Sequence, residues 1–238
     1  MRPYSFTEPP LETLQPEVAE VPVPTAEELQ EQSEFFGEMD DAKLQEVTES
    51  LNQFTDHERD VYLRAVEAEP ALTRDVQEIC EETGSTPGGL EYRLKQPDSL
   101  LDKIHERDDP MEIDEIKDIN RYTQLFRPEE LAEGVNDSLA RFEERGYQVE
   151  KISNTWDDPS YPYNGINVKL VSPDGVSMEM QYHTQESFEL KNGEMHDLYR
   201  EWQHLPPDSE EAIELNERMF ELSDTLKRPP GVEGVRKK

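Results

Sequence analysis

The stretch that decides the fold lies at residues 163–187 and reads YNGINVKLVSPDGVSMEMQYHTQES. At its centre, Ser172-Pro-Asp-Gly175 has the composition of a tight turn. The residues before the turn, 166–171, and those after it, 176–183, are rich in Val, Ile, Met and Tyr, and polar residues alternate with them. A period of two residues is typical of β-strands, so this stretch predicts a β-hairpin.

One face of the predicted hairpin is polar. Glu179, Gln181 and His183 stand at positions i, i+2 and i+4 and therefore share a face of their strand. Residues of the preceding segment follow the same period: Tyr163, Gly165, Asn167 and Lys169. A carboxylate in such a set is suited to hold a metal ion or accept a proton. The alternative is a plain solvated strand face, which is often polar.

Strands and helices alternate outward from the hairpin. Residues 119–126 and 147–152 predict two further strands. A helix is predicted from Pro128 to a close at Gly146, and others at 98–107, 193–204 and 208–227. Strands interleaved with helices in this way predict the α+β class, with a mixed β-sheet flanked by helices.

Residues 1–90 are more acidic, relative to their length, than the rest of the chain. Residues 1–90 carry 22 acidic and 5 basic residues, a net charge of −17, whereas residues 91–238 carry 34 and 19, a net charge of −15. The first 24 residues are rich in Pro and Glu without an apolar period, which predicts a disordered arm. Thr25-Ala-Glu-Glu28 is a capping box that begins a helix. Further helical patterns lie at 41–53, 56–68 and 71–83, and Gly84 begins a segment that ends them.

The chain thus divides into four parts. We predict a disordered arm at 1–24, an acidic helical extension at 25–69, a folded α+β domain at 70–230 and a tail at 231–238.

Composition argues against several classes of protein. The net charge is 24 − 56 = −32, which disfavours DNA and anionic membranes as partners. No run approaches the roughly 18 apolar residues of a membrane span, and the N-terminus MRPYSFTEPPLETL lacks the apolar core of a secretory signal. Cys80 is the only cysteine, so neither an intramolecular disulfide nor a cysteine-based metal site is expected.

A basic cluster surrounds the start of the predicted helix at 98–107. It consists of Arg93, Lys95, Ser99 and Lys103. Cationic side chains and helix N-termini both favour phosphate, although a solvated basic helix face is the plain alternative. Asp118 lies at the edge of the predicted strand 119–126 and, together with Glu179, fits Mg²⁺, which proteins commonly bind through one or two carboxylates plus substrate phosphates.

Taken in this order, these segments resemble the synthetase domain of the RelA/SpoT homologues, the alarmone synthetases. The resemblance is greatest to the toxin-like single-domain branch found in polymorphic toxins and phages, and it covers roughly residues 70 to 230. The matching stretches are GLEYRLKQPDSLLDKI (89–104), KDINRYT (117–123), YNGINV (163–168), EMQYHTQES (179–187) and HDLY (196–199). The resemblance implies a nucleotidyltransferase-like synthetase fold.

It also implies an activity and a set of site residues. The family transfers the β,γ-pyrophosphate of ATP to the 3′-hydroxyl of a purine nucleotide, which gives (p)ppGpp- or (p)ppApp-type products and, in a toxin or effector, inhibits growth. The catalytic residues implied are Glu179, Asp118 and Arg121, with Mg²⁺ held by Asp118 and Glu179. The implied ATP-binding residues are Arg93, Lys95, Ser99 and Lys103. The implied acceptor-binding residues are Tyr163, Asn167, Lys169, Gln181 and His183.

The acceptor and the class of function stay open at this point. Asn167 replaces the His of the common synthetases, so guanosine nucleotides, adenosine nucleotides and the tRNA 3′ end all remain candidates. A catalytically silent acidic interaction protein, with residues 25–83 docking a partner, is an alternative of a different class. Residues 1–90 contain only His57, which argues against a His-Asp hydrolase domain there. We expect action in the cytoplasm, non-classical delivery if the chain is an effector, and an antitoxin or immunity protein as partner.

Overall fold

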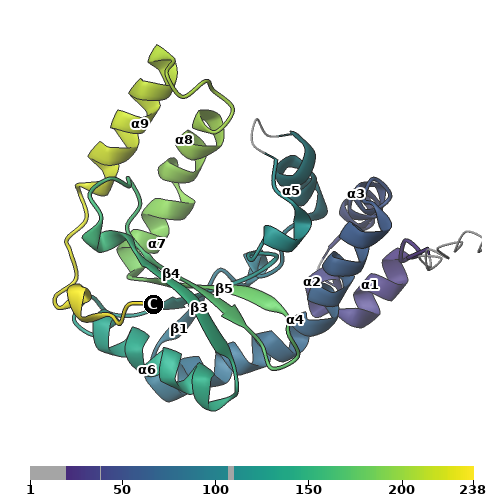
Figure 1. Cartoon of the computed structure of the whole chain (residues 1–238), viewed down its shortest axis with the longest axis horizontal. Coiled ribbons are helices and arrows are strands. Elements are labelled where there is room, and N and C mark those ends of the chain that lie inside the picture. Colours follow the sequence, from purple (N-terminus) through teal and green to yellow (C-terminus); the bar gives the residue numbers. More distant parts are fainter. Residues whose placement is uncertain (1–19, 38, 107–109) are drawn as a thin grey trace, which may run out of the picture.

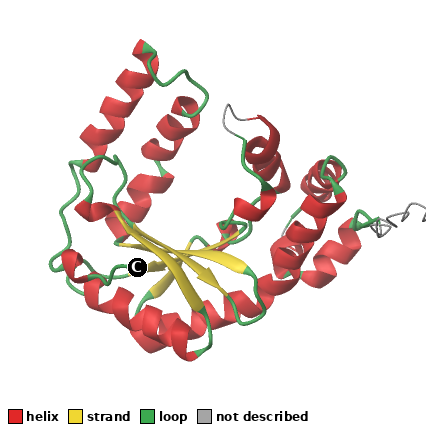
Figure 2. Cartoon of the chain, in the orientation of Figure 1, coloured by secondary structure: helices red, strands yellow, loops and turns green. Residues whose placement is uncertain are grey.

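The structure is a computed structural model of the chain, and it describes residues 20–37, 39–106 and 110–238. The predicted disordered arm lies outside the described residues up to residue 19. Figure 1 shows a β-sheet with two long helices beneath it and two groups of helices rising from the opposite side. Coloured by secondary structure, the strands gather at the centre of the molecule (Figure 2).

Five strands form a single mixed sheet in the order β1-β2-β5-β4-β3. Their bounds are β1 Thr86–Gly88, β2 Asn120–Leu125, β3 Gln148–Asn154, β4 Ile166–Val171 and β5 Ser177–His183. β4 and β5 form the predicted hairpin, with Ile166 opposite Tyr182 and Val171 opposite Ser177. β2 is parallel to β5, whereas the other pairs of neighbours are antiparallel. The predicted α+β class with a mixed sheet is confirmed.

The main core lies on one face of this sheet. Two helices cover that face, α4 (Asp56–Thr83) and α6 (Leu131–Glu144) (Figure 1). Alternate residues of the central strands are buried in this core: Tyr122, Val168, Leu170, Met178, Met180 and Tyr182. They pack with helix residues that include Leu72, Val76, Val135 and Leu139. Burial of this apolar area provides the main stabilisation of the sheet.

A second apolar core joins the N-terminal extension to the rest of the chain. The extension forms α1 (Ala26–Gln32), α2 (Glu34–Gly37) and α3 (Asp41–Leu51). The predicted capping box at Thr25 and Glu28 is present at the start of α1. These helices pack on the first half of α4 and on α5 (Pro97–Leu101), which continues as a π-helical turn over Asp102–Glu106.

α4 differs from the prediction of two helices at 56–68 and 71–83. It is one helix of 28 residues that passes through Pro70 without a break. Tyr62 and Val66 belong to the second core and Leu72 and Val76 to the main core, so packing on both sides of Pro70 holds the helix together. The boundary predicted at residue 70 falls inside this helix, and the division into domains stays a prediction.

Three helices follow the hairpin: α7 (Gln185–Asn192), α8 (Glu194–Trp202) and α9 (Glu210–Ser223). They rise together on the side of the sheet opposite α4 and α6 (Figure 1). α8 and α9 match the predictions, whereas α7 and β1 were not predicted. Short 3-10 turns lie at Leu90–Tyr92, Ile113–Glu115, Thr155–Asp157 and Val232–Gly234.

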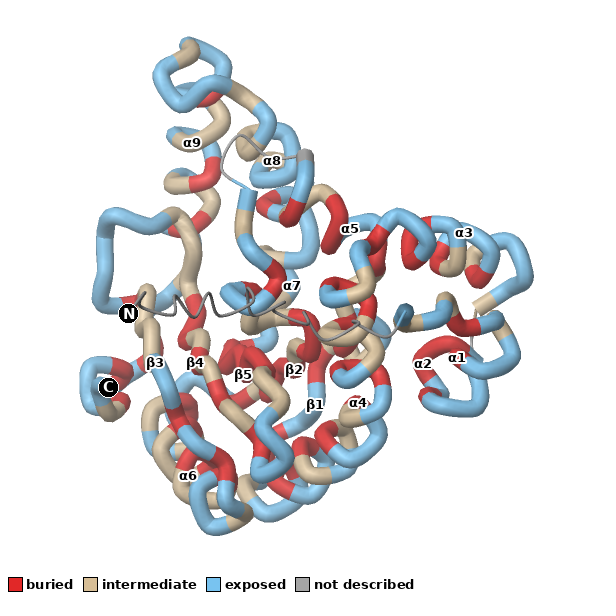
Figure 3. The backbone as a smooth tube through the Cα atoms, turned by 45° about the vertical axis from the view of Figure 1, so that its right-hand side comes forward, coloured by how far each residue is buried: buried red, intermediate tan, exposed pale blue. Residues whose placement is uncertain are grey.

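The C-terminal segment returns to the sheet. Val232 and Val235, within the predicted tail, are buried in the main core. Figure 3 shows that the central strands β2 and β5 are largely buried. None of the helices in the described part of the chain is long and apolar enough to cross a membrane.

Candidate active site

A polar set of side chains lies on the sheet face opposite the main core. The register places Arg121 of β2 opposite Glu179 of β5, and Lys169 of β4 opposite the same glutamate. Two residues further along β5, Gln181 lies opposite Thr123 and Asn167. Residues paired across neighbouring strands point to the same face of the sheet, and so does every second residue along each strand. We call this surface the polar face, and it consists of Arg121, Thr123, Asn167, Lys169, Glu179, Gln181 and His183.

A line of hydrogen bonds crosses the polar face through Glu179. Its Oε2 pairs with Lys169 Nζ, and its Oε1 accepts from Gln181 Nε2 at 2.6 Å. Gln181 Oε1 in turn accepts from Lys191 Nζ of α7, also at 2.6 Å. Both Glu179 and Gln181 are buried. The carboxylate is therefore held in one orientation by two partners.

Asp118 forms the centre of a second cluster, just before β2. Lys103 Nζ lies 2.8 Å from Asp118 Oδ1, and Lys95 Nζ lies 3.2 Å from Oδ2. Lys103 stands on the π-helical turn, a local widening of the helix that is frequent at functional sites. Burial alone would raise the pKa of Asp118, but the charges of Lys95 and Lys103 outweigh it and hold that pKa well below its usual range. Burial lowers the pKa of Lys95, although Asp118 opposes the shift.

Tyr163 and His183 form a closely packed pair at the end of the polar face. Tyr163 lies in the loop before β4, not on the strand as its period suggested. Its hydroxyl donates to Asn167 Oδ1 at 2.8 Å and lies 2.9 Å from His183 Nε2. The two rings meet edge to face with their centroids 5.5 Å apart. Burial raises the pKa of the Tyr163 hydroxyl well above its usual range.

His183 is fully enclosed, with 0% of its surface exposed. Its Nδ1 lies 3.0 Å from Ser187 Oγ at the start of α7. Burial, with the nearby charge of Lys191, lowers the pKa of His183 to about 3. The imidazole is therefore neutral at ordinary pH and acts as a hydrogen-bonding support for Tyr163.

Arg93 differs from the other predicted ATP-binding cations. Its guanidinium pairs with Glu69 of α4, and both side chains are almost completely buried. The ring of Phe35 from α2 lies 5.3 Å from the guanidinium carbon, and Ser33 Oγ donates to the same glutamate. The structure thus places Arg93 inside the contact between extension and sheet. Ser99 is exposed on α5.

The polar face and the Asp118 cluster together form a strongly cationic region. The charges of Lys95, Lys103 and Lys169 all act on Asp118, and Arg121 acts on both Lys95 and Lys191. Four cations, Lys95, Lys103, Lys169 and Arg121, against the carboxylates of Asp118 and Glu179 give 4 − 2 = +2, within a chain of net charge −32. Lys191 adds a partial charge, because burial and the charge of Arg121 lower its pKa to about 7. Such a local concentration of positive charge favours polyphosphate ligands.

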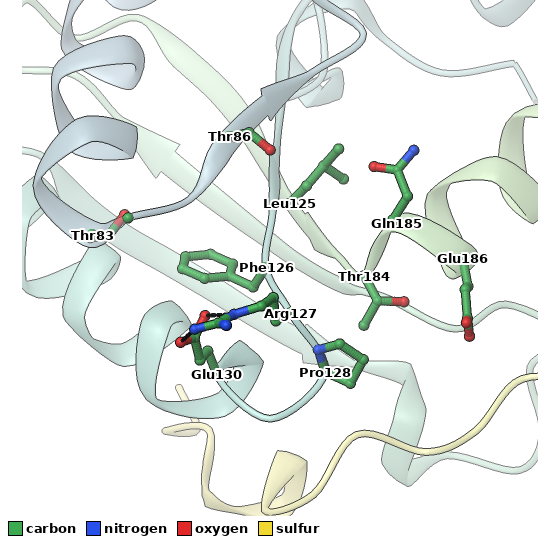
Figure 4. Close-up of a pocket in the computed structure, with 11 residues that line it drawn as sticks. Thr83, Thr86, Leu125, Phe126, Arg127, Pro128, Glu130, Thr184, Gln185 and Glu186 are labelled. Atoms are coloured by element: carbon green, nitrogen blue, oxygen red, sulfur yellow. Dashed lines mark hydrogen bonds and ion pairs between the residues drawn. The ribbon is translucent and has the colours of Figure 1, made fainter.

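A cavity of about 550 Å³ lies near the carboxyl ends of β2 and β5. Leu125, Phe126 and Thr184 line it, but none of the predicted site residues does (Figure 4). The cation in its lining, Arg127, is paired with Glu130. Because this arginine is already neutralised by a carboxylate, the cavity is a weaker candidate for binding a phosphate group than the polar face is.

Comparison with known proteins agrees with this architecture. No protein-family model matches the chain, and no curated protein matches it. Solved structures do match. A chain in the crystal structure of the complex between the Type VI effector Tas1 and its immunity protein aligns with a TM-score of 0.55 and 22% identity, covering 72% of this chain and 97% of that one. The crystal structure of the small alarmone synthetase 2 from Bacillus subtilis aligns with a TM-score of 0.50 and 15% identity, covering 69% and 88%.

The chain has the alarmone synthetase fold. The resemblance predicted from the sequence motifs is confirmed at the level of the fold. Within this synthetase fold, residues from four of the five predicted motif segments, 89–104, 117–123, 163–168 and 179–187, meet at the polar face and the Asp118 cluster. The structure brings together Lys95, Lys103, Asp118, Arg121, Asn167, Lys169, Glu179 and Gln181. Tyr163 and the enclosed His183 lie at one end of this set, whereas Arg93 lies in the interior.

Two residues of this site were not predicted from the sequence. Lys191 lies on α7, a helix that the sequence analysis missed, although Thr184 and Ser187 form its capping box. Glu69 stands beside Pro70, where a break between two helices was predicted. For α7 the available signal was the capping box at Thr184 and Ser187, at the end of the motif stretch 179–187.

Proposed function

We propose that this chain is a nucleotide 3′-pyrophosphokinase, which uses ATP to pyrophosphorylate the 3′-hydroxyl of a purine nucleotide. The observation that carries the proposal is the polar face: an oriented carboxylate, Glu179, surrounded by a net positive charge on an alarmone synthetase fold. A carboxylate near cations is what a reaction between a hydroxyl and a polyphosphate requires.

The reaction forms one bond and breaks one bond. The acceptor 3′-oxygen attacks the β-phosphorus of ATP, and the bond from that phosphorus to the α–β bridging oxygen breaks. The bridging oxygen leaves with the electron pair as part of AMP, and the β- and γ-phosphates remain on the acceptor. Glu179 accepts the proton of the 3′-hydroxyl and releases it to solvent.

The residues around Asp118 are assigned to ATP. Lys95 and Lys103 converge on one side of this carboxylate, and their ammonium groups are suited to hold the β- and γ-phosphates. Arg121 of β2 is the register partner of Glu179 on β5. It is therefore suited to stabilise the negative charge that develops during transfer. Arg93 supports this region from the interior through Glu69 and is assigned a positioning role.

Mg²⁺ is the metal that this donor set fits. No group of three or more His, Cys, Asp or Glu side chains that could hold a metal gathers in the residues that the structure describes. Mg²⁺ needs only one or two carboxylates when substrate phosphates complete its shell, so Asp118 and Glu179 would hold it together with ATP. A bound Mg²⁺ neutralises phosphate charge.

The acceptor is assigned to the end of the polar face near Tyr163. The Tyr163 ring is fixed by Asn167 and His183, which suits it to stack on a purine base. Guanosine and adenosine nucleotides both present such a base. A tRNA 3′ end is disfavoured by the charge of −32, and it remains as one outcome of the test below.

The biological role we propose is a growth-inhibiting toxin or effector that acts in the cytoplasm. Support comes from the match to a structure of the Type VI effector Tas1 with its immunity protein. By analogy, we infer that a neutralising partner of this kind exists for the present chain.

A product assay tests the proposed activity. The full chain is incubated with ATP, Mg²⁺ and, separately, GDP, GTP, AMP, ADP and tRNA, and the products are resolved by mass spectrometry. We expect AMP in amounts equal to a pyrophosphorylated acceptor, and its loss in Glu179→Gln. Absence of product with every acceptor would contradict the proposal and favour a silent interaction protein.

A further inference from the structure

The loop that carries Tyr163 leaves the sheet between β3 and β4 and spans residues 155–165. Hydrogen bonds close its base, since Thr155 N donates to Gly165 O at 3.1 Å and Gly165 N donates to Thr155 Oγ1 at 3.0 Å. Residues 157–161, at the tip of the loop, are exposed. An exposed loop of this kind opens readily unless other parts of the chain hold it. The C-terminal segment after α9 runs past this loop (Figure 1).

The end of α9 holds the loop next to Tyr163. Asn164 Nδ2 donates to the main-chain oxygen of Ser223 at 3.0 Å and to its Oγ at 2.7 Å. Ser223 is buried, and it is the last residue of α9. Because Asn164 directly follows Tyr163 in the chain, this contact fixes the backbone that carries the Tyr163 ring.

Arg228 holds the other side of the same loop. Its guanidinium donates to the main-chain oxygen of Trp156 and pairs with the carboxylate of Asp157. Two partners keep the planar guanidinium in one orientation. Just before the loop, Asn154 Nδ2 donates to the main-chain oxygen of Val232 at 2.8 Å. The C-terminal segment therefore contacts the loop from its beginning to its end.

This C-terminal segment is itself anchored in the body of the protein. Val232 and Val235 are buried in the main core. Asn136 of α6 donates to Gly234 O at 3.1 Å and accepts from Arg236 N at 3.0 Å. A segment that is fixed by α9 at one end and by α6 at the other can hold the loop against which it lies.

We propose that residues 223–236 form a strap that fixes the Tyr163 loop for acceptor binding, with Asn164 and Arg228 as positioning residues. The inference rests on the proposed function for the role of Tyr163. A loop that is ordered before binding loses less conformational entropy when its ligand arrives, so the ligand binds more tightly. The strap thus raises the affinity for the acceptor through the loop and leaves the ATP side at Lys95 and Lys103 unaffected.

The alternative is that the strap only stabilises the fold. Asn164→Ala and Arg228→Gln each remove one tie between strap and loop and leave the apolar anchor in place. Arg218→Gln is the matched control, because Arg218 lies on α9 and pairs with Glu194 and Glu221, away from the loop. Thermal unfolding of each variant checks that the fold is kept.

The first measurement is amide hydrogen exchange of the full chain, followed by mass spectrometry of a peptide that covers residues 154–165. We expect the protected amides at the base of the loop to exchange about three- to tenfold faster in Asn164→Ala and in Arg228→Gln, since the loop opens more often once a hydrogen bond is lost. The peptide from β2 and the Arg218→Gln control should exchange as in the unmodified chain. Unchanged exchange of the loop, or an equal increase in β2, would overturn the strap.

The second measurement separates the two substrates. With the acceptor that the product assay identifies, we expect the KM of the acceptor to rise about three- to tenfold in Asn164→Ala and in Arg228→Gln, while the KM of ATP stays the same. An unchanged acceptor KM, or an equal rise for ATP, would overturn the positioning role. If the unmodified chain shows no turnover, the proposed function fails, whereas hydrogen exchange still decides whether the strap fixes the loop.

Discussion

The two faces of the central sheet are built from alternate residues of the same strands. On β5, Met178, Met180 and Tyr182 are buried in the main core, while Glu179 and Gln181 belong to the polar face. β2 and β4 repeat the arrangement, with Tyr122 and Val168 on one side and Thr123 and Lys169 on the other. One step along a strand therefore moves a side chain from the apolar core to the charged polar face.

This comparison separates the residues that stabilise the fold from those that carry the chemistry. The core face gains free energy from apolar burial, whereas the polar face and the adjoining Asp118 cluster place several cations and two carboxylates close together. Neighbouring residues of one strand should therefore give opposite phenotypes on substitution. The predictions below test that separation.

The largest expected effect comes from Glu179→Gln, compared with Met180→Ala next to it. Loss of the carboxylate should lower kcat by about 10²–10⁴-fold, as expected for a general base, with little change in the free energy of unfolding. Met180 has 0% exposure, so its truncation should lower the free energy of unfolding by about 2–5 kcal/mol while the folded fraction keeps its activity. Urea unfolding and initial rates measure both.

The separation would be wrong if the two variants behaved alike. Equal losses of stability would mean that Glu179 and its partners Lys169 and Gln181 hold the sheet together. Equal losses of activity per folded molecule would mean that the core face sets the geometry of the site.

A smaller effect is expected from Gly165→Ala, at the point where the loop carrying Tyr163 enters β4. A Cβ at this position would lie 2.6 Å from His183 Cε1 and 2.6 Å from the Tyr163 hydroxyl, so both rings would have to move. We expect a loss of about 1–3 kcal/mol in the free energy of unfolding, as for overpacked sites, and a higher KM for the acceptor. Gly175→Ala is not a clean control because its φ is +82°, whereas Gly234→Ala meets nothing within 4 Å.

Retention of the acceptor KM in Gly165→Ala would contradict the role of the Tyr163–His183 pair. A loss of stability alone would show that Gly165 serves only the packing of the loop.

The smallest expected effect concerns pH and His183. Its pKa in the folded chain is about 3, below the usual value of 6.5, so between these values the unfolded chain binds a proton that the folded chain does not. The free energy of unfolding therefore falls as pH is lowered, by about 1.4 kcal/mol per pH unit well below 6.5. Urea unfolding at pH 7 and pH 5.5 should show a smaller decrease in His183→Gln than in the unmodified chain.

His196→Gln is the matched control for this titration, because His196 is exposed on α8. An equal pH dependence in His183→Gln and the unmodified chain would mean that His183 is protonated in the fold, and the neutral support of Tyr163 would have to be abandoned.

The sequence predicted the hairpin and its polar face because both depend on local rules. A tight turn at Ser172–Gly175 and a period of two residues determine which side chains of β4 and β5 share a face. β2 was predicted as a strand, but its parallel pairing with β5 depends on contacts between distant segments, which no local pattern encodes. The basic residues and Asp118 were each predicted from the sequence, but not their contact, since Lys95 and Lys103 lie in separate segments before β2.

Other parts of the site could not be predicted for related reasons. Pro70 suggested a break, whereas tertiary packing keeps α4 continuous. Arg93 matched a phosphate-binding pattern, but in the fold it is buried between two other side chains. Glu69 comes from α4 next to Pro70, and Phe35 comes from the N-terminal extension. Burial of a cation depends on what packs over it, and the residues that do so here are 24 and 58 positions away.

The most direct test of the central claim follows the phosphates of ATP. ATP labelled at its β-phosphorus is incubated with the full chain, Mg²⁺ and the acceptor that the product assay identifies, and the products are separated. The account predicts that the label moves to the acceptor with the γ-phosphate and that unlabelled AMP is formed, and that Glu179→Gln abolishes this transfer. Recovery of the label in ADP, or transfer that persists in Glu179→Gln, would contradict pyrophosphate transfer at the polar face.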